Sequence, residues 1–308
     1  MNKVSSLTKT NNRLGEKIIH KILFICGAIS ILTTLAILYV LISEGLHFFA
    51  QVSITEFLTD TAWRPFGSVE SEAFRIGIWP LINGTLLVTF IALIVAVPLG
   101  LASAIYLAEY ASKRIRSKVK PALEILAGIP TVVLGYFALT LVTPFLRNIF
   151  STDLIDIFNA LSAGIVVGVM IVPTVASLSE DAMSAVPQSL RNASLGLGVT
   201  KSATVLKVVF PAALSGIISS IILAMGRAIG ETMIVSIAAG NLPAMTLNPG
   251  DQVQTMTGYI VQAVGGEAHR GSLTYNSIFA VGIVLFAMTF ALNLLANYFT
   301  KKFREVYA

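Results

Sequence analysis

The sequence has few charged residues, a single cysteine and none of the common catalytic motifs. Each of these absences excludes a class of protein. Only 12% of the 308 residues are charged, against roughly 25% in soluble domains. Cys26 is the single cysteine, so the chain has no internal disulfide and no cysteine-based metal site. The patterns H-E-x-x-H, G-x-S-x-G and G-x-x-x-x-G-K followed by Ser or Thr do not occur, which excludes the common hydrolytic sites and an ATP-binding loop. We therefore expect a protein that is not an enzyme.

Apolar residues are what the sequence has in excess. They make up 55% of the chain, and the mean hydropathy is +0.82. A content this high has to be divided into segments of about 20 residues, each of which crosses roughly 30 Å of hydrocarbon. The sequence therefore predicts an all-α integral membrane protein with about six transmembrane helices. The six runs are about 18–42, 80–108, 122–146, 158–179, 210–240 and 275–299.

The Lys and Arg residues between the runs predict the orientation. Alternate segments hold sixteen and four of them, and one more, Arg227, lies inside the fifth run. Because Lys and Arg concentrate in cytoplasmic loops, we expect a multi-pass protein with both termini in the cytoplasm. Residues 1–17 are then a cytoplasmic tail, and 18–308 are one membrane domain. The net charge of +5 reflects this topology and predicts no binding of nucleic acid.

Two outer loops contain short amphipathic segments. In residues 44–79, Ile54, Phe57, Leu58 and Trp63 recur at near-helical spacing, which predicts a short helix along the interface. In the second outer loop, Val253 to Ala263 predicts another helix. Neither pattern assigns a role.

The fifth run carries small residues at every fourth position. Such a stripe lets helix backbones approach closely and predicts a central helix with neighbours along its length. The neighbours are either helices of this chain or those of a second subunit. The stripe consists of Ala212, Gly216, Ser220, Ala224, Ala228, Thr232, Ser236 and Gly240.

Arg227 and Glu231 lie within the same run at a spacing of four, at which helical side chains can meet. A charge at mid-membrane costs about 2.5–3.5 kcal/mol, so both side chains should face the bundle interior or a wet cavity. In one interpretation the pair only neutralises itself. In the other, the planar guanidinium of Arg227 binds an anion in transit, and Glu231 weakens that binding enough for release.

The cytoplasmic loop over about 180–209 predicts two short helices joined at a glycine turn. Leu190, Ala193, Ser194 and Leu197 form a small apolar face, Gly198 permits a sharp reversal, and Thr200 suits the cap of the second helix. Such a helix suits insertion into a groove of a partner. These features fit an ordinary connector equally well.

The spacing of this loop resembles the EAA loop of ATP-binding-cassette importer permeases. That pattern is E-A-A, three residues, Gly, nine residues, then I-x-L-P. Here Asn192-Ala-Ser is followed by Gly198 and by Val208-Val-Phe-Pro211 at the same spacing, although Asn192 replaces the acid and Phe210 the leucine. The resemblance implies contact with an ATPase through Leu190, Arg191, Asn192, Ala193, Ser194, Leu197, Gly198, Thr200 and Pro211.

Further segments resemble the permeases of the phosphate-specific transport system. They are Asn83-Gly-Thr-Leu-Leu, Val97 to Glu109, Glu124 to Gly135 and Gly226 to Met233, and Phe57 to Pro65 is more similar to the PstC type than to the PstA type. The resemblance implies the bundle of type I importer permeases (MetI-like) and a substrate path at Arg227 and Glu231.

The same resemblance implies a function and a set of partners. The chain is expected to be the permease subunit of an ATP-driven phosphate importer in the bacterial inner membrane. Its expected partners are a second permease (PstA type), an ATPase dimer (PstB type) that holds ATP and Mg, an extracytoplasmic phosphate-binding protein (PstS type), phosphate and membrane lipid. The chain itself is expected to bind no cofactor. The alternatives are a permease for sulfate, molybdate or phosphonate, and a passive anion channel.

Overall fold

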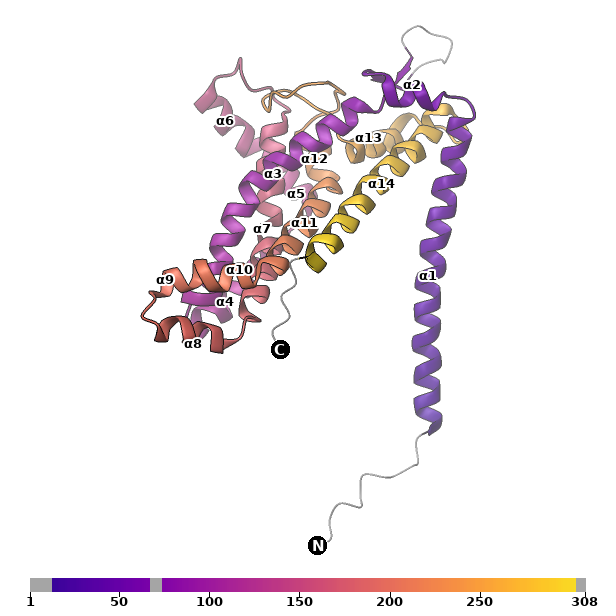
Figure 1. The fold of residues 1–308 in the computed structure, drawn as a ribbon. Coiled ribbons are helices and arrows are strands. Elements are labelled where there is room, and N and C mark those ends of the chain that lie inside the picture. Colours follow the sequence, from indigo (N-terminus) through magenta and orange to yellow (C-terminus); the bar gives the residue numbers. More distant parts are fainter. Residues whose placement is uncertain (1–12, 67–73, 303–308) are drawn as a thin grey trace.

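The computed structural model describes residues 13–66 and 74–302. Most of the expected tail, residues 1–12, and the C-terminal residues 303–308 lie outside the described residues, and so do the expectations placed on them. Figure 1 shows a tilted bundle of helices with one long helix, α1 (Arg13–Phe49), standing beside it.

The elements that follow α1 are almost all helical. Four π-helical turns, η1 to η4, extend or interrupt the α-helices. In chain order the elements are α2 (Ile54–Thr59), β1 (Trp63–Arg64), β2 (Arg75–Ile76), α3 (Trp79–Ile105), η1 (Tyr106–Tyr110), α4 (Lys113–Ala127), α5 (Thr131–Phe137), η2 (Ala138–Val142), α6 (Thr143–Phe150), α7 (Ala160–Ser184), α8 (Gln188–Gly196), α9 (Lys201–Thr204), η3 (Val205–Val209), α10 (Phe210–Ala212), α11 (Leu214–Ile229), α12 (Met233–Ala238), α13 (Met256–Gln262), η4 (Ala263–Glu267) and α14 (Leu273–Lys302).

The two ends of the bundle differ in what they carry. We call the end with α4, α8, α9 and α10 the basic end, and the end with α2, the two strands and α13 the hairpin end (Figure 1). The start of α1 and the end of α14 both lie toward the basic end. Of the sixteen Lys and Arg residues that predicted the cytoplasmic side, those that the structure describes therefore lie toward one end of the bundle.

Five helical segments of the described chain are long and apolar enough to cross a membrane. A sixth span is formed by Lys201–Ala212 and Leu214–Ile229 if this pair, bent by 70°, is taken together. The third span runs over Thr131–Phe150, later than the predicted 122–146. The reason is the break at Gly128 to Pro130, because proline lacks an N–H and disfavours helix in the residue before it. The polar segment ahead of this break forms α4.

The fifth run is not one continuous helix, contrary to the expectation from its stripe of small residues. Helix α11 ends at Ile229, and α12 begins only at Met233. Within α11 the stripe packs against α7 of the same chain: a Cβ at Gly216 would lie 2.4 Å from that of Ala182, and the hydroxyls of Ser220 and Ser179 are 2.7 Å apart. The stripe therefore serves the chain's own bundle.

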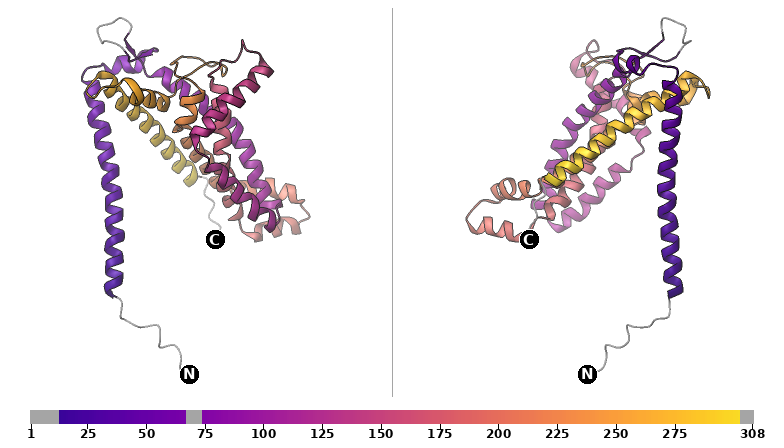
Figure 2. Two further views of the ribbon diagram at one scale, coloured as in Figure 1. Left: turned by 180° about the vertical axis from the view of Figure 1, so that it is seen from behind. Right: turned by 45° about the vertical axis from the view of Figure 1, so that its right-hand side comes forward.

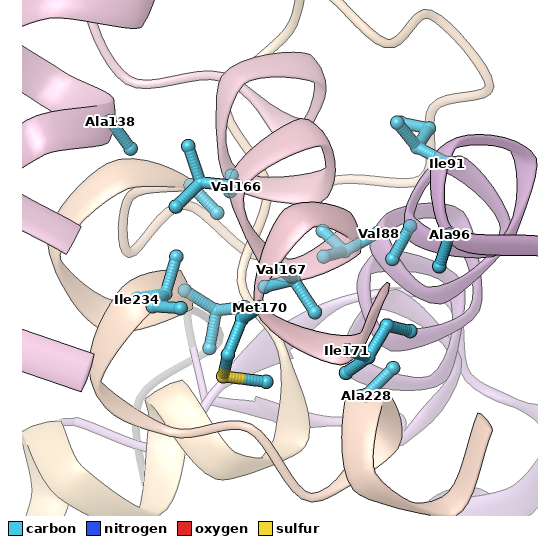
Figure 3. Packing of buried hydrophobic residues seen from close by; sticks show 14 of the residues in the cluster. Val88, Ile91, Ala96, Ala138, Val166, Val167, Met170, Ile171, Ala228 and Ile234 are labelled. Atoms are coloured by element: carbon cyan, nitrogen blue, oxygen red, sulfur yellow. The ribbon is translucent and has the colours of Figure 1, made fainter. Parts of the chain in front are cut away.

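The core lies where α7 packs against α3, α11 and α12. Figure 3 shows side chains of α7, among them Val167 and Met170, between those of α3 and α12. Close approach depends on glycine, because a Cβ at Gly164 would lie 2.6 Å from Ile91 and one at Gly168 would lie 2.8 Å from Val95. In a membrane, where lipid is as apolar as leucine, such close packing holds helices together.

Helix α1 contacts the bundle near its C-terminal end. A Cβ at Gly45 would meet Ile283 of α14, and one at Gly282 would meet Leu41. Residues 15–44 of α1 are exposed or half-buried in the single chain. Figure 2 shows α1 diverging from α14 below this contact.

The hairpin end is closed by the two predicted outer segments. Phe57 of α2 and Trp63 of β1 are fully buried with Tyr259 of α13. A short helix forms in each predicted segment, but Trp63 lies in a strand and not in the predicted helix. Strands β1 and β2 pair antiparallel, with Trp63 opposite Ile76. Asp60 accepts a hydrogen bond of 2.6 Å from Arg75, and this guanidinium holds the pKa of Asp60 below its usual range.

Candidate functional site

The break between α11 and α12 is held open by Glu231. Its side chain is 8% exposed, and Oε1 accepts hydrogen bonds from the backbone N–H groups of Met233 at 3.1 Å and Ile234 at 3.3 Å. A helix start has N–H groups without helical partners, so this carboxylate caps α12. A negative charge at the start of a helix is also favoured by the helix dipole.

Arg227 lies on the last turn of α11, and its side chain is exposed in the single chain. Nη1 donates a hydrogen bond of 3.1 Å to Oγ1 of Thr174 on α7. Across the described residues, no ion pair joins Arg227 to Glu231. The helix break removes the i, i+4 geometry on which the predicted pairing depended.

Part of the α11 face that carries Arg227 is left open by this chain. Nothing lies within 4 Å of a Cβ built on Gly226, and Gly230 is exposed. A guanidinium within a span and open to lipid costs about 2.5–3.5 kcal/mol. This face therefore meets water or a second protein rather than lipid. The guanidinium keeps donors free for a planar or tetrahedral oxyanion.

Helix α13 supports the break from the hairpin end. Thr257 Oγ1 donates to the backbone carbonyl of Glu231 at 2.6 Å, and the N–H of Met256 donates to Thr85 on α3 at 3.0 Å. Nothing in the sequence marked Thr257 or Thr174 as part of the site, because threonines at ordinary positions give no signal of their own. Thr85 lies in the segment Asn83-Gly-Thr-Leu-Leu, but no site role was predicted for it. No group of three or more His, Cys, Asp or Glu side chains that could hold a metal ion occurs within residues 13–66 and 74–302.

The loop at the basic end has the predicted shape of two helical pieces about a turn. Gly198 adopts φ of +81°, in the region that favours glycine. Thr200 caps α9 by accepting from the N–H of Ala203 at 3.4 Å. Ser194 and Thr204 tie the two pieces together through hydroxyls 2.9 Å apart. The predicted turn and cap are both confirmed.

Arg191 is internal, although the resemblance placed it among the residues that contact an ATPase. It is 8% exposed, and it donates to Glu109 of η1 at 2.9 and 3.1 Å. It also donates to the backbone carbonyls of Met183, at 2.8 Å, and Val186. Arg191 thus fastens α8 to the ends of α3 and α7. Glu109 was not singled out, since it lies 82 residues away.

The other predicted loop residues divide into buried and exposed sets. Leu190 packs half-buried under the loop, and Ser194 is buried. Asn192, Ala193, Thr200 and Pro211 are exposed, and Leu197 is 84% exposed. Leu195, which the sequence analysis did not select, is 47% exposed. Of the predicted apolar face, Ala193 and Leu197 point outward, whereas Leu190 and Ser194 do not, and Leu195 is a further exposed leucine of α8.

A cleft beside the loop separates it from the end of α3. Its volume is about 350 Å³, and Glu109, Gln188, Asn192 and Lys201 are among its lining residues. The chain continues from this cleft through η3 and α10, bends by 70° at Ala213, and enters α11. Covalent continuity thus joins the exposed loop to the helix that carries Arg227.

Comparison with known proteins identifies relatives along nearly the whole chain. Residues 96–305 match the family model described as "Binding-protein-dependent transport system inner membrane component". The probable ABC transporter permease protein YqgH of Bacillus subtilis is 36% identical over 297 residues, with 96% of this chain and 94% of that protein covered. The phosphate transport system permease protein PstC of Mesorhizobium japonicum is 32% identical over 268 residues, with 79% of this chain and 77% of that protein covered.

A solved structure shares the fold. It is that of a bacterial alginate ABC transporter in complex with a periplasmic protein bound to an alginate pentasaccharide. The TM-score is 0.64 and the identity 16%, and the similarity covers 96% of this chain and 100% of the matched chain. The predicted helical membrane bundle is thereby confirmed.

Proposed function

The chain belongs to the family of binding-protein-dependent transport system inner membrane components, as a type I ABC importer permease, and from this membership we propose that it transports phosphate. Relatives of the PstC type, such as that of Mesorhizobium japonicum, support the choice of phosphate. The single observation that carries the proposal is Arg227, an exposed arginine within a span that donates to Thr174 and forms no ion pair with Glu231.

Arg227 is proposed to bind the anion transiently. Its guanidinium forks suit the oxygens of phosphate, and its one hydrogen bond in the chain, to Thr174, is to a neutral hydroxyl. Glu231 is proposed to lower the affinity through its charge while it caps α12. A site with both features binds phosphate and still releases it.

The partners are proposed on the same basis. A second permease of the PstA type would cover the open face of α11 and complete the path. An ATPase dimer of the PstB type would hold ATP and Mg and dock on Leu195 and Leu197 at the basic end, which would then face the cytoplasm. A phosphate-binding protein of the PstS type would deliver the anion at the hairpin end. Both chain termini would lie in the cytoplasm of a bacterium, and the protein would reside in its inner membrane.

Another oxyanion is the alternative substrate, since an arginine fork also suits sulfate, molybdate and phosphonate. A passive anion channel would likewise use an arginine in its pore. A channel has no need of the exposed leucines at the basic end, and this observation favours the importer.

The test is phosphate uptake by proteoliposomes that contain the chain with its candidate partners. Arg227→Gln should reduce uptake by roughly 10- to 100-fold, because a charge-assisted hydrogen bond contributes about 1.5–3 kcal/mol. Lys21→Gln is the control, since Lys21 is an exposed cation of α1, which stands beside the bundle. Size-exclusion chromatography checks that each variant still assembles.

Each result decides between the alternatives. Uptake that requires ATP and that arsenate inhibits better than sulfate does supports a phosphate importer. Uptake without ATP would favour the channel, and stronger inhibition by sulfate would favour a different oxyanion. Normal uptake by Arg227→Gln would refute the binding role of this arginine.

A further inference from the structure

Helix α4 carries five basic residues within its first eight positions, and the transport path uses none of them. The helix starts at Ser112, whose side chain accepts from the N–H of Ile115 at 3.3 Å. It is strongly amphipathic, yet none of its residues is buried by the chain. It ends at Ala127, shortly before the third span begins at Thr131. Such a helix lies at the boundary between the membrane and the solution.

Two of the five cations hold α4 to the bundle. Lys120 donates to Glu180 at 2.9 Å and to Asp181 at 2.7 Å, and Arg116 pairs with the same Glu180. Glu180 is fully buried, and it also accepts from Ser184 at 3.2 Å. Asp181 and Glu180 raise the pKa of Lys120, so this side chain stays charged. Arg116 and Lys120 are therefore paired with carboxylates of α7.

The remaining three cations are free. Lys113, Arg114 and Lys118 are exposed, and none of them forms an ion pair with a residue that the structure describes. Arg114 and Lys118 are four residues apart and share one helix face with Ile125, which is 73% exposed. The cations thus occupy the start of this face and the apolar side chain occupies its end, nearest the third span.

We propose that the free face of α4 formed by Arg114, Lys118 and Ile125, with Lys113 beside it at the start of the helix, binds the phosphate headgroups of acidic phospholipids. The cations would pair with the headgroup, and Ile125 would contact the acyl chain. A soluble anion would have no use for the apolar part of this face, whereas a lipid uses both parts. Basic amphipathic helices on the cytoplasmic side recognise anionic lipid in this way.

The bound lipid would act on the loop through the side of the helix that carries the two paired cations. Arg116 and Lys120 connect α4 to Glu180 and Asp181, which lie on the last turns of α7 just ahead of α8. A lipid that fixes α4 at the membrane surface therefore also fixes the origin of the loop. Acidic lipid bound to α4 would in this way also hold the loop that contains α8.

The test measures lipid retained by the full chain in native mass spectrometry, with phosphatidylglycerol or phosphatidylcholine added in detergent. The variant replaces Lys113, Arg114 and Lys118 with Gln. Each cation near an anionic surface strengthens binding roughly fivefold, so the triple variant should bind phosphatidylglycerol on the order of 100-fold more weakly. The control replaces Lys17, Lys21 and Lys301 with Gln, which removes three exposed cations toward the same end.

The proposal expects tight phosphatidylglycerol binding by the unmodified chain and by the control, and weak binding of phosphatidylcholine by all. A second variant, with Lys113→Arg, Arg114→Lys and Lys118→Arg, should still bind phosphatidylglycerol tightly, because it keeps all three positive charges. Equal loss in the triple variant and the control would overturn the proposal. Displacement of the lipid by millimolar inorganic phosphate would also overturn it, in favour of a soluble-anion site.

Discussion

The carboxylate of Glu231 caps a helix, and the proposed function gives its negative charge a second task. Its Oε1 caps the start of α12 through the N–H groups of Met233 and Ile234. A neutral amide oxygen in the same place can accept these bonds as well. The charge is therefore free to act on an anion held near the break, and substitutions can separate the two tasks.

Glu231→Gln should leave the thermal stability of the chain nearly unchanged, because an acceptor for the α12 N–H groups remains. Glu231→Ala should destabilise the chain by about 0.5–2 kcal/mol, the usual cost of losing a helix cap. Both variants should alter the rate of phosphate uptake, since both lack the charge. Thermal unfolding in detergent and uptake in proteoliposomes provide the two measurements. If Glu231→Gln transports normally, the carboxylate serves only as a cap.

At this scale the sequence singled out Arg227 and Glu231 but did not predict how they are arranged. Charges within an apolar run are rare, so Arg227 and Glu231 stand out without any structure. Their predicted pairing assumed a continuous helix, which the interruption between Ile229 and Met233 removes. A glycine such as Gly230 lowers helix propensity by about 1 kcal/mol, but many membrane helices contain glycine. The propensity alone did not predict the break.

Among the elements, α8 is held in place by an ion pair that is distant in the sequence. Arg191 and Glu109 are both largely buried, with side chains 10% and 8% exposed. Loss of one member of a buried pair leaves the other charge without a partner, which costs about 3–5 kcal/mol. The position of the loop relative to α3 therefore depends on Glu109, a residue that lies outside the loop.

Arg191→Gln should loosen α8 and lower the free energy of unfolding of the chain by about 2–4 kcal/mol. Hydrogen exchange of residues 188–196 should rise in the variant, and this measurement locates the effect. The matched control is Lys201→Gln. Lys201 is an exposed cation of the same loop whose contact is with the ring of Tyr110, 4.8 Å away, and its loss should cost less than about 1 kcal/mol. If the amides of α8 were equally protected from exchange in both variants, the Arg191–Glu109 pair would not be what holds α8 in place.

The secondary-structure elements could be predicted where the hydrophobic period or a residue that breaks a helix determines their bounds. The turn at Gly198 and the cap at Thr200 followed from residue type. The start of the third span was placed too early, because Leu123, Ile125 and Leu126 extend the apolar pattern into α4. Pro130 decides the boundary, yet proline also occurs inside spans, as Pro98 and Pro173 do in α3 and α7. Its effect depends on the neighbouring helices that satisfy the freed backbone groups.

For the whole molecule, the uncovered surfaces indicate an assembly. Residues 15–44 of α1 are exposed or half-buried, part of the Arg227 side of α11 is left open by the chain, and Leu197 projects from the basic end. Lipid can cover α1, but it is a poor environment for Arg227, and water is a poor one for Leu197. The last two surfaces are where the proposed second permease and ATPase would bind. Composition predicted the spans, and it carried no information on these surfaces.

We expect coupling between the proposed ATPase and the path to depend on the backbone at Gly198. The substitution Gly198→Val leaves room for the side chain, since nothing lies within 4 Å of a Cβ there, but φ of +81° is strained for a β-branched residue. The turn should relax and reorient Leu195 and Leu197, at a cost on the order of 1–2 kcal/mol. The ratio of ATP hydrolysed to phosphate taken up should then rise, or the complex with the ATPase should fail to form.

Gly198→Asn is the control that isolates the backbone. Asparagine adopts left-handed conformations more readily than other non-glycine residues, so this variant should keep coupled transport while it adds a side chain of similar bulk. If steric contact with the ATPase were the cause, both variants would fail together. If Gly198→Val transports and hydrolyses in the normal ratio, the loop does not transmit movement through this turn. If Gly198→Val loses coupled transport and Gly198→Asn keeps it, coupling depends on the backbone conformation of the turn between α8 and α9.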